Sequence, residues 1–126
     1  MGDVGSYDEP GKKMAMSVSS LLSKAGLSIG ILGSKETCDG NDVKSLGETG
    51  LFAKLAEENI RVFKEIGVKK IITLDPHAFN AFTKEYPKLG GKFKVWHYTQ
   101  VLARLMKDKN IPLSGYKVKV TYHDSC

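Results

Sequence analysis

Cysteine is scarce in this chain of 126 residues, which has only Cys38 and Cys126. Two thiols so far apart in the sequence cannot form the disulfide scaffold of a small secreted protein, so reduced cysteines are expected. No apolar run approaches the roughly 20 residues that cross a bilayer, and the first residues lack the apolar stretch of a secretory signal. The sequence therefore predicts a cytoplasmic protein that has no membrane span of its own.

Arginine is also scarce, because 17 of the 19 basic residues are lysine. Proteins that bind nucleic acid rely on the bidentate guanidinium group, whereas scattered lysines usually solvate a surface, so no nucleic-acid partner is expected. The formal net charge is +5, and residues 84–119 contain nine basic side chains against two acidic ones. This region is either an ordinary solvated surface or a docking surface for an acidic partner.

What is present is the composition of a folded globular protein. Hydrophobic residues make up 41% of the chain and charged residues 26%, which excludes wholesale disorder. The length suits one domain with a single core. We therefore expect residues 1–126 to form one domain.

Hydrophobic periodicity alternates along the chain between helix and strand patterns. Helices are expected from Asp8 to Gly26 and over 51–66, 77–86 and 99–107, and strands over 27–32, 68–74, 93–97 and 116–122. This alternation predicts an α/β fold with a mostly parallel sheet of about four strands, covered by helices on both faces. The chain opens without the leading strand that such folds usually have and closes directly after a strand, so we expect a piece of a longer protein.

Four polar clusters fall in the loops where a parallel sheet collects its functional groups. They occupy residues 2–5, 37–40, 75–78 and 123–126. In open parallel sheets, ligands bind at the carboxyl ends of the strands. Each cluster alone is better explained as a loop with turn residues, but together they predict one shared site.

The spacing of these clusters resembles a known cysteine frame. Residues 3, 38, 39, 75 and 78 fit Cys-x(34)-Cys-Cys-x(35)-Cys-x-x-Cys, and Gly40 completes a Cys-Cys-Gly signature. The surrounding stretches GSYDEPGKK, AGLSIGILGSKETCDGND, LGETGLFAKLAEENI, GVKKIITLDPHAFNAFTKEYP, VWHYTQVLARLM and VTYHDSC extend the similarity along nearly the whole chain. The sequence resembles the cysteine-rich CCG domain of the heterodisulfide reductase and iron-sulfur oxidoreductase family. The resemblance extends to the subunits that carry the catalytic iron-sulfur site in heterodisulfide reductase and in membrane redox complexes of sulfate reducers.

The resemblance implies a Rossmann-like, three-layer α/β domain that usually occurs as two halves in one chain. It implies electron transfer to or from thiol and disulfide substrates, with an iron-sulfur cluster bound by the frame cysteines. It also implies other subunits of a redox complex as partners, which would place the protein in the cytoplasm, at the inner face of the membrane.

The chain departs from the family frame at four of five positions. Only Cys38 keeps a thiol, whereas Asp3, Asp39 and Asp75 offer carboxylates and Ala78 offers no ligating atom. Because iron-sulfur clusters select thiolates, this half has a degenerate cluster motif, and no complete cluster is expected within residues 1–126. The resemblance leaves Cys38 as a candidate ligand, with the three aspartates at degenerate ligand positions.

Cys126 and two histidines are further candidates for the site. The resemblance implies that Cys126 helps to ligate the catalytic cluster of the longer protein, although a stray terminal thiol is an equal alternative. His77 either lines the pocket or packs locally. His123 lies near Cys126 and beside Asp124, which is the composition of a thiolate-activating pair. His97, at a predicted strand end, is expected to be structural.

Three functions remain open from the sequence. The first is a half-domain of an iron-sulfur oxidoreductase that shapes the catalytic pocket. The second is a cofactor-free structural or docking module of a redox complex, which the loss of four cysteines favours. The third is metal-dependent hydrolysis through Asp3, Asp39, Asp75 and His77, because carboxylates and imidazole suit harder metals. The third has the least support, since the sequence supplies no nucleophile or positioned base beyond those ligands.

Overall fold

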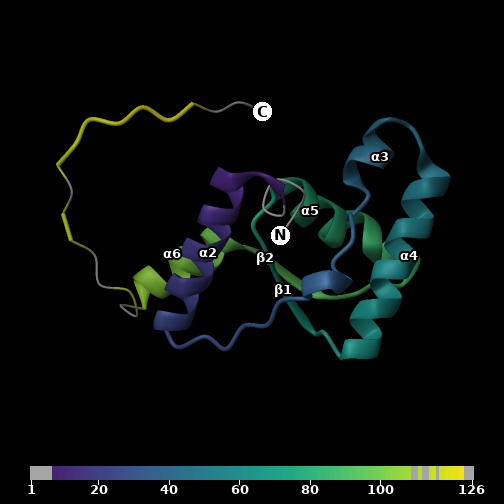
Figure 1. Ribbon diagram of the computed structural model, residues 1–126, viewed down its shortest axis with the longest axis horizontal. Coiled ribbons are helices and arrows are strands. Elements are labelled where there is room, and N and C mark those ends of the chain that lie inside the picture. The colour runs from purple at the N-terminus through teal and green to yellow at the C-terminus, as the bar shows by residue number, and fades with distance from the viewer. Residues whose placement is uncertain (1–6, 109–110, 112–113, 116, 124–126) are drawn as a thin grey trace.

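The computed structural model describes residues 7–108, 111, 114–115 and 117–123 (Figure 1). Its helices are α2 (Glu9–Lys24), α3 (Asn41–Ser45), α4 (Thr49–Ile66), α5 (Pro76–Asn80) and α6 (Tyr98–Lys107), and its strands are β1 (Lys70–Thr73) and β2 (Lys94–His97). Short 3-10 turns form at Gly33–Lys35 and Tyr86–Leu89, and a π turn forms at Ala81–Glu85. Within this part of the chain, no helix is long and apolar enough to span a membrane.

Helix α2 begins and ends where the local chemistry predicts. The Asp8 carboxylate accepts a hydrogen bond from the Gly11 N–H at 3.0 Å, and Pro10 lies in the first turn, where its missing N–H needs no partner. After the helix, Gly26 adopts a φ of +84°, a conformation that glycine enters without a steric penalty. The predicted first helix is therefore confirmed.

The helix predicted to stop before Pro87 is less regular and longer than expected. The Asp75 carboxylate caps α5 by accepting a hydrogen bond from the His77 N–H at 2.9 Å. The chain then continues as the π turn and as the 3-10 turn that contains Pro87. Proline stands in the first turn of this last segment, where no N–H is required, so it does not end the helical winding.

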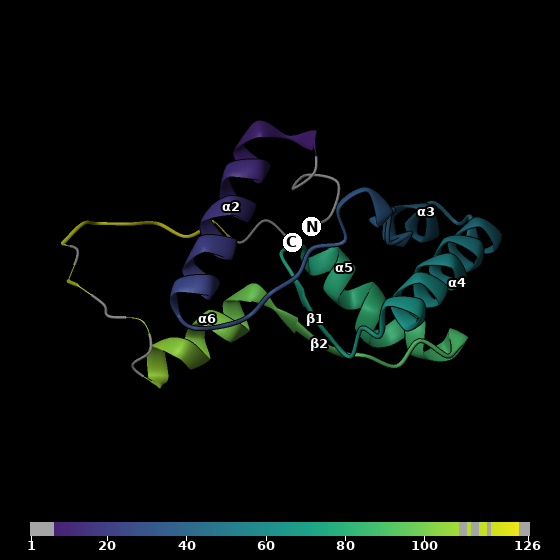
Figure 2. The same ribbon diagram turned by 60° about the horizontal axis from the view of Figure 1, so that its bottom comes forward.

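The two strands form a parallel sheet at the centre of the molecule. Lys70 lies opposite Lys94, and Thr73 lies opposite His97. Because side chains alternate between the faces of a strand, Ile71 packs against one hydrophobic cluster and Ile72 against another. Helix α4 and residues 81–86 supply the first cluster, whereas α2 and α6 supply the second. Figures 1 and 2 show these helices on opposite sides of the sheet.

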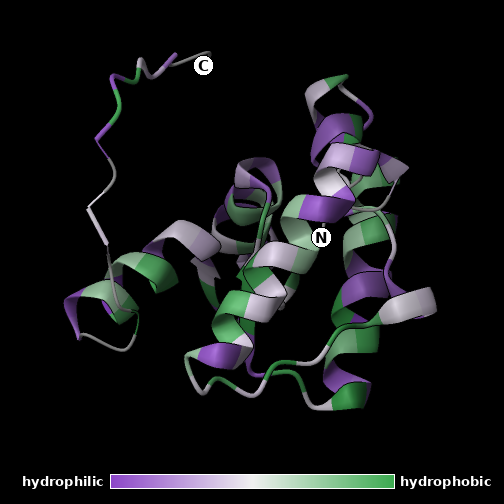
Figure 3. Ribbon diagram, turned by 60° about the vertical axis from the view of Figure 1, so that its left-hand side comes forward, coloured by the Kyte–Doolittle hydropathy of each residue, from purple (hydrophilic) through white to green (hydrophobic). Residues whose placement is uncertain are grey.

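The expected Rossmann-like, three-layer fold with about four strands is wrong. The sheet has two strands, and residues 27–32 and 117–122 form neither strand nor helix in the described part of the chain. Residues 30–32 lie across a cavity from β1, and Leu32 has a helical backbone conformation (φ −76°, ψ −21°), so no backbone ladder forms there. Residues 117–122 are exposed and alternate between hydrophobic and hydrophilic side chains (Figure 3), yet an extended segment without a pairing partner gains no ladder hydrogen bonds.

A charged cluster ties α3 to the π turn and gives a pH-dependent prediction. The Lys44 and Lys88 ammonium groups each lie 2.8 Å from the same Glu85 oxygen, and their hydrogen bonds hold the pKa of Glu85 below its ordinary value of 4.5. A carboxylate whose pKa is lowered by folding stabilises the protein above its unfolded pKa and loses that contribution as the pH falls. We expect Glu85→Gln to lower the free energy of unfolding by about 0.5–1 kcal/mol at neutral pH.

This difference between the variant and the natural chain should shrink as the pH falls below 4.5. Urea titrations at several pH values would measure it. Glu57→Gln, which changes an exposed carboxylate of α4, is the matched control and should change the free energy of unfolding at neutral pH by less than about 0.5 kcal/mol. Equal stabilities of the Glu85 variant and the natural chain at neutral pH would contradict the prediction.

Candidate functional site

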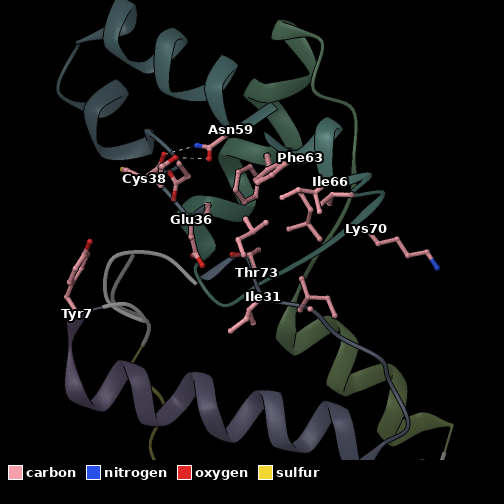
Figure 4. A pocket seen from close by; sticks show the side chains of 18 residues that line it. Tyr7, Ile31, Glu36, Cys38, Asn59, Phe63, Ile66, Lys70 and Thr73 are labelled. Carbon is pink, nitrogen blue, oxygen red and sulfur yellow. Dashed lines mark hydrogen bonds between the residues drawn. The ribbon is translucent and has the colours of Figure 1, made fainter. Parts of the chain in front are cut away.

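A cavity of about 470 Å³ lies beside β1. Its walls come from β1, from residues 30–32, from the loop 36–39 and from α4. Figure 4 shows Cys38 and Asn59 at one end of the cavity and Lys70 at the other. The carboxyl end of β1, marked by Thr73, also faces the cavity, so its position agrees with the usual place of ligands in parallel sheets.

The loop that carries Cys38 turns sharply at Gly40. This glycine has a φ of +83° and is buried, and a Cβ atom added to it would lie 2.9 Å from the Phe52 ring. The Gly40 N–H donates a hydrogen bond to Cys38 Sγ at 3.4 Å, and the Asn41 N–H donates one to Asp39 Oδ1 at 2.8 Å. Glycine is therefore required here both by the backbone conformation and by the close approach of the core.

Two buried residues hold this loop from behind. Asn59 is 3% exposed, and its amide donates hydrogen bonds to the Cys38 carbonyl oxygen at 2.9 Å and to the Tyr86 hydroxyl at 3.0 Å. Its carbonyl oxygen accepts one from the Thr37 hydroxyl at 2.8 Å. Burial raises the pKa of Tyr86, so the hydroxyl stays protonated. It donates a hydrogen bond to the Asp39 carbonyl oxygen at 3.1 Å. We call Asn59 and Tyr86 the loop clamp.

The loop clamp was not predicted from the sequence, although one signal was available. Asn59 lies on the apolar stripe of α4, with Ala56, Ile60 and Phe63 buried around it. A polar residue in such a stripe requires hydrogen-bond partners, because a buried amide without them is strongly destabilising. Its partners could not be identified from the sequence, since Thr37 and Tyr86 come from distant segments.

The structure brings together part of the predicted site. Cys38, Asp39 and Ala78 all line the cavity. Asp75 does not line it, because its carboxylate caps α5, and His77 is exposed on the first turn of that helix. Three positions of the family frame therefore lie at the cavity, whereas Asp75, the fourth described position, caps α5.

The remaining candidates lie apart from the cavity. His123 is exposed in the extended segment near the end of the chain, and Asp3 and Cys126 lie outside the described residues. His97 has a structural role, because its Nε2 lies 3.1 Å from the Leu74 carbonyl oxygen and its Nδ1 lies 2.7 Å from the Thr99 hydroxyl.

The described residues do not fit an iron-sulfur cluster. No group of three or more histidine, cysteine and carboxylate side chains is placed to hold a metal in the part of the chain that the structure describes. At the cavity, Cys38 offers one thiol and Ala78 offers no ligand atom. Since such clusters are held mainly by thiolates, the described residues supply at most part of a ligand set.

Comparisons with known proteins identify relatives. A probable iron-sulfur-binding oxidoreductase, FadF, of Bacillus subtilis is 46% identical over 127 residues and covers 100% of this chain and 18% of its own length. An EtfAB:quinone oxidoreductase of Syntrophomonas wolfei is 42% identical, over 96% of this chain and 17% of its own length. A subunit of the dihydromethanophenazine:CoB–CoM heterodisulfide reductase of Methanosarcina mazei is 30% identical, over 90% of this chain and 29% of its own length.

The chain thus spans about a fifth to a third of these curated relatives. No solved structure matches it. The family model described as the CCG cysteine-rich domain matches residues 4–83, a range that includes the Cys38 loop, the loop clamp residue Asn59 and the cap of α5. The chain therefore belongs to the CCG cysteine-rich domain family.

Proposed function

We propose that this chain is part of a heterodisulfide-reductase-like iron-sulfur oxidoreductase that transfers electrons to or from thiol or disulfide substrates. It forms a single cysteine-rich domain, one half of a longer protein with two such halves. The longer protein binds an iron-sulfur cluster, and the cluster-binding motif of this half is degenerate. Its partners are other subunits of a redox complex, which hold it in the cytoplasm, at the inner face of the membrane.

The observation that carries this proposal is the convergence of frame positions on one cavity. The adjacent residues Cys38 and Asp39 lie in one loop and Ala78 lies in α5, yet all three line it. The loop that carries two of these positions is also held from behind by hydrogen bonds from Asn59 and Tyr86. The names of the relatives, which designate iron-sulfur and redox proteins, support the redox assignment.

The residues of this half shape the pocket and hold one thiol in a defined position. The loop clamp fixes two consecutive peptide groups of this loop, because Asn59 donates to the Cys38 carbonyl oxygen and Tyr86 donates to the Asp39 carbonyl oxygen. The Gly40 N–H donates a hydrogen bond to Cys38 Sγ, which fixes the position of the sulfur at the cavity wall. Cys126, with His123 nearby in the sequence, is proposed as a second ligand toward the other half.

Restoring the frame tests whether it is a degenerate iron-sulfur motif. We expect the variant with Asp3→Cys, Asp39→Cys, Asp75→Cys and Ala78→Cys to take up iron and acid-labile sulfide after anaerobic reconstitution, at several times the level of the natural chain, because thiolates replace weak ligands. The same variant with Cys38→Ser is the control and should lose the added iron. A variant that is folded by circular dichroism and still binds no iron would contradict the proposal.

A cofactor-free docking module is the second candidate, and the lack of a grouped metal-ligand set among the described residues favours it. Such a module would use its exposed lysines, including Lys84, Lys92 and Lys94, to contact an acidic partner. We expect subunits that co-purify with the full-length protein to dissociate as sodium chloride rises from about 0.05 to 0.5 M, because salt screens exposed charges. Association that is insensitive to salt would count against this surface.

A further inference from the structure

The edge of β1 that faces away from β2 opens into the cavity. The Lys94 N–H donates to the Lys69 carbonyl oxygen at 3.1 Å, and Lys70 lies opposite Lys94. In a parallel ladder, alternate residues of one strand direct both backbone groups toward the partner strand. The backbone groups of Ile71 and Thr73 therefore face β2, and those of Lys70 and Ile72 face the cavity.

Nothing in the described part of the chain pairs with that edge. Residues 30–32 form the opposite wall of the cavity, but they make no ladder with β1. Ile72 is half-buried, and the cavity around it is also lined by Leu32, Phe63 and Phe82. Backbone N–H and C=O groups in such surroundings require hydrogen-bond partners. An extended peptide supplies both donors and acceptors at the required spacing.

We propose that this cavity is the acceptor slot for a β-strand that is supplied from outside this chain, by the longer protein, and that adds to β1 in parallel. Apolar side chains line the cavity from both sides, with Ile31 on the loop and Phe63 on α4 (Figure 4). A parallel strand that is buried on both faces has a nearly continuous hydrophobic sequence. The occupant is therefore a run of about four to six aliphatic or aromatic residues.

A second copy of this chain fits the slot poorly. Its extended segment outside the core, residues 117–122, alternates valine with lysine. Insertion would direct its lysines to one face of the sheet and its valines to the other. Ile71 and Ile72 lie in hydrophobic clusters on the two faces, so one row of lysines would be buried among apolar side chains, which is unfavourable. By contrast, this chain spans only 17–29% of its curated relatives, so a longer protein has ample chain to supply the strand. Tyr7, just before α2, borders the same cavity, so a parallel strand would end close to this helix.

Amide hydrogen exchange with an internal control tests the slot. Overlapping ten-residue synthetic peptides that cover the Bacillus subtilis relative outside its matched region are added one at a time to the 126-residue chain. We expect one hydrophobic peptide to slow exchange of the Lys70 and Ile72 amides at least about tenfold. The Ile71 and Thr73 amides, which already face β2, should change little. A scrambled version of the same peptide should have no effect.

A variant that fills the slot separates specific insertion from general stabilisation. A Cβ atom added to Gly30, which lines the cavity, meets nothing within 4 Å, so Gly30→Leu should fold and block the peptide effect. Gly115→Leu, with equally open surroundings outside the cavity, should leave the effect intact. The proposal is overturned if no peptide protects the Lys70 and Ile72 amides, or if Gly30→Leu does not block the protection. It is also overturned if these amides become protected without any peptide when sedimentation shows that the chain self-associates.

The slot does not depend on the proposed redox function. A failure of the restored frame to bind iron leaves the exchange experiment unchanged, and a failure of the exchange experiment leaves the iron measurement unchanged. The two outcomes are therefore distinguishable.

Discussion

Replacing Asn59 by alanine is expected to lower the free energy of unfolding by about 2–4 kcal/mol, one of the two largest effects in the chain. The substitution removes three hydrogen bonds, among them the one from the Asn59 amide to the Cys38 carbonyl oxygen. Each buried polar group that loses its partner costs about 1–3 kcal/mol, and the smaller side chain also leaves a void. Urea denaturation followed by circular dichroism would measure the change.

The control for Asn59→Ala is Glu57→Ala, an exposed position two residues away on the same helix. It should change stability by less than about 0.5 kcal/mol. Tyr86→Phe should cost about 1 kcal/mol, because it removes only the hydroxyl that links Asn59 to the Asp39 carbonyl oxygen. If Asn59→Ala were no worse than Glu57→Ala, the loop clamp would not hold the Cys38 loop.

The Gly40→Ala substitution is expected to have the second large effect, a loss of about 2–4 kcal/mol. Two separate penalties add at this position. A residue with a side chain is disfavoured by about 1–2 kcal/mol at a φ of +83°. The new methyl group would also lie 2.9 Å from the ring of Phe52, which is only 5% exposed and cannot move away without disturbing the core.

Gly26→Ala separates these two penalties. Gly26 has nearly the same φ, +84°, but a Cβ atom there would meet nothing within 4 Å. It should therefore carry only the conformational penalty and be less damaging than Gly40→Ala by at least about 1 kcal/mol. Equal losses in the two variants would show that the contact with Phe52 does not constrain the Cys38 loop.

The helices could be predicted from the sequence because their signals are local. Asp8 and Pro10 mark the start of α2, and Gly67, with a φ of +78°, marks the end of α4. The strand predicted at 27–32 does not form, and neither does the described part, 117–122, of the strand predicted at 116–122, because a strand depends on a pairing partner. Their composition favours extended structure, but β1 is separated from the first by a cavity, and the second has no neighbour in the described chain.

The candidate site could be predicted in part for a similar reason. The frame spacing indicated Cys38, Asp39 and Ala78, which do line one cavity. The spacing could not show that the Asp75 carboxylate caps a helix, because aspartate is equally suited to be a cap and a ligand. The spacing also could not identify Tyr86, whose hydroxyl donates to the carbonyl oxygen of Asp39, 47 positions away in the sequence. Long-range contacts of this kind depend on the tertiary fold.

The degenerate cluster motif is tested most directly by the iron and acid-labile sulfide content of the natural chain, purified and reconstituted without oxygen. We expect well-folded protein with iron far below one cluster per chain, because the described residues bring a single thiol, that of Cys38, to the cavity. Stoichiometric iron and sulfide that disappear on Cys38→Ser would contradict this expectation. Such a result would mean that this half builds a redox centre by itself.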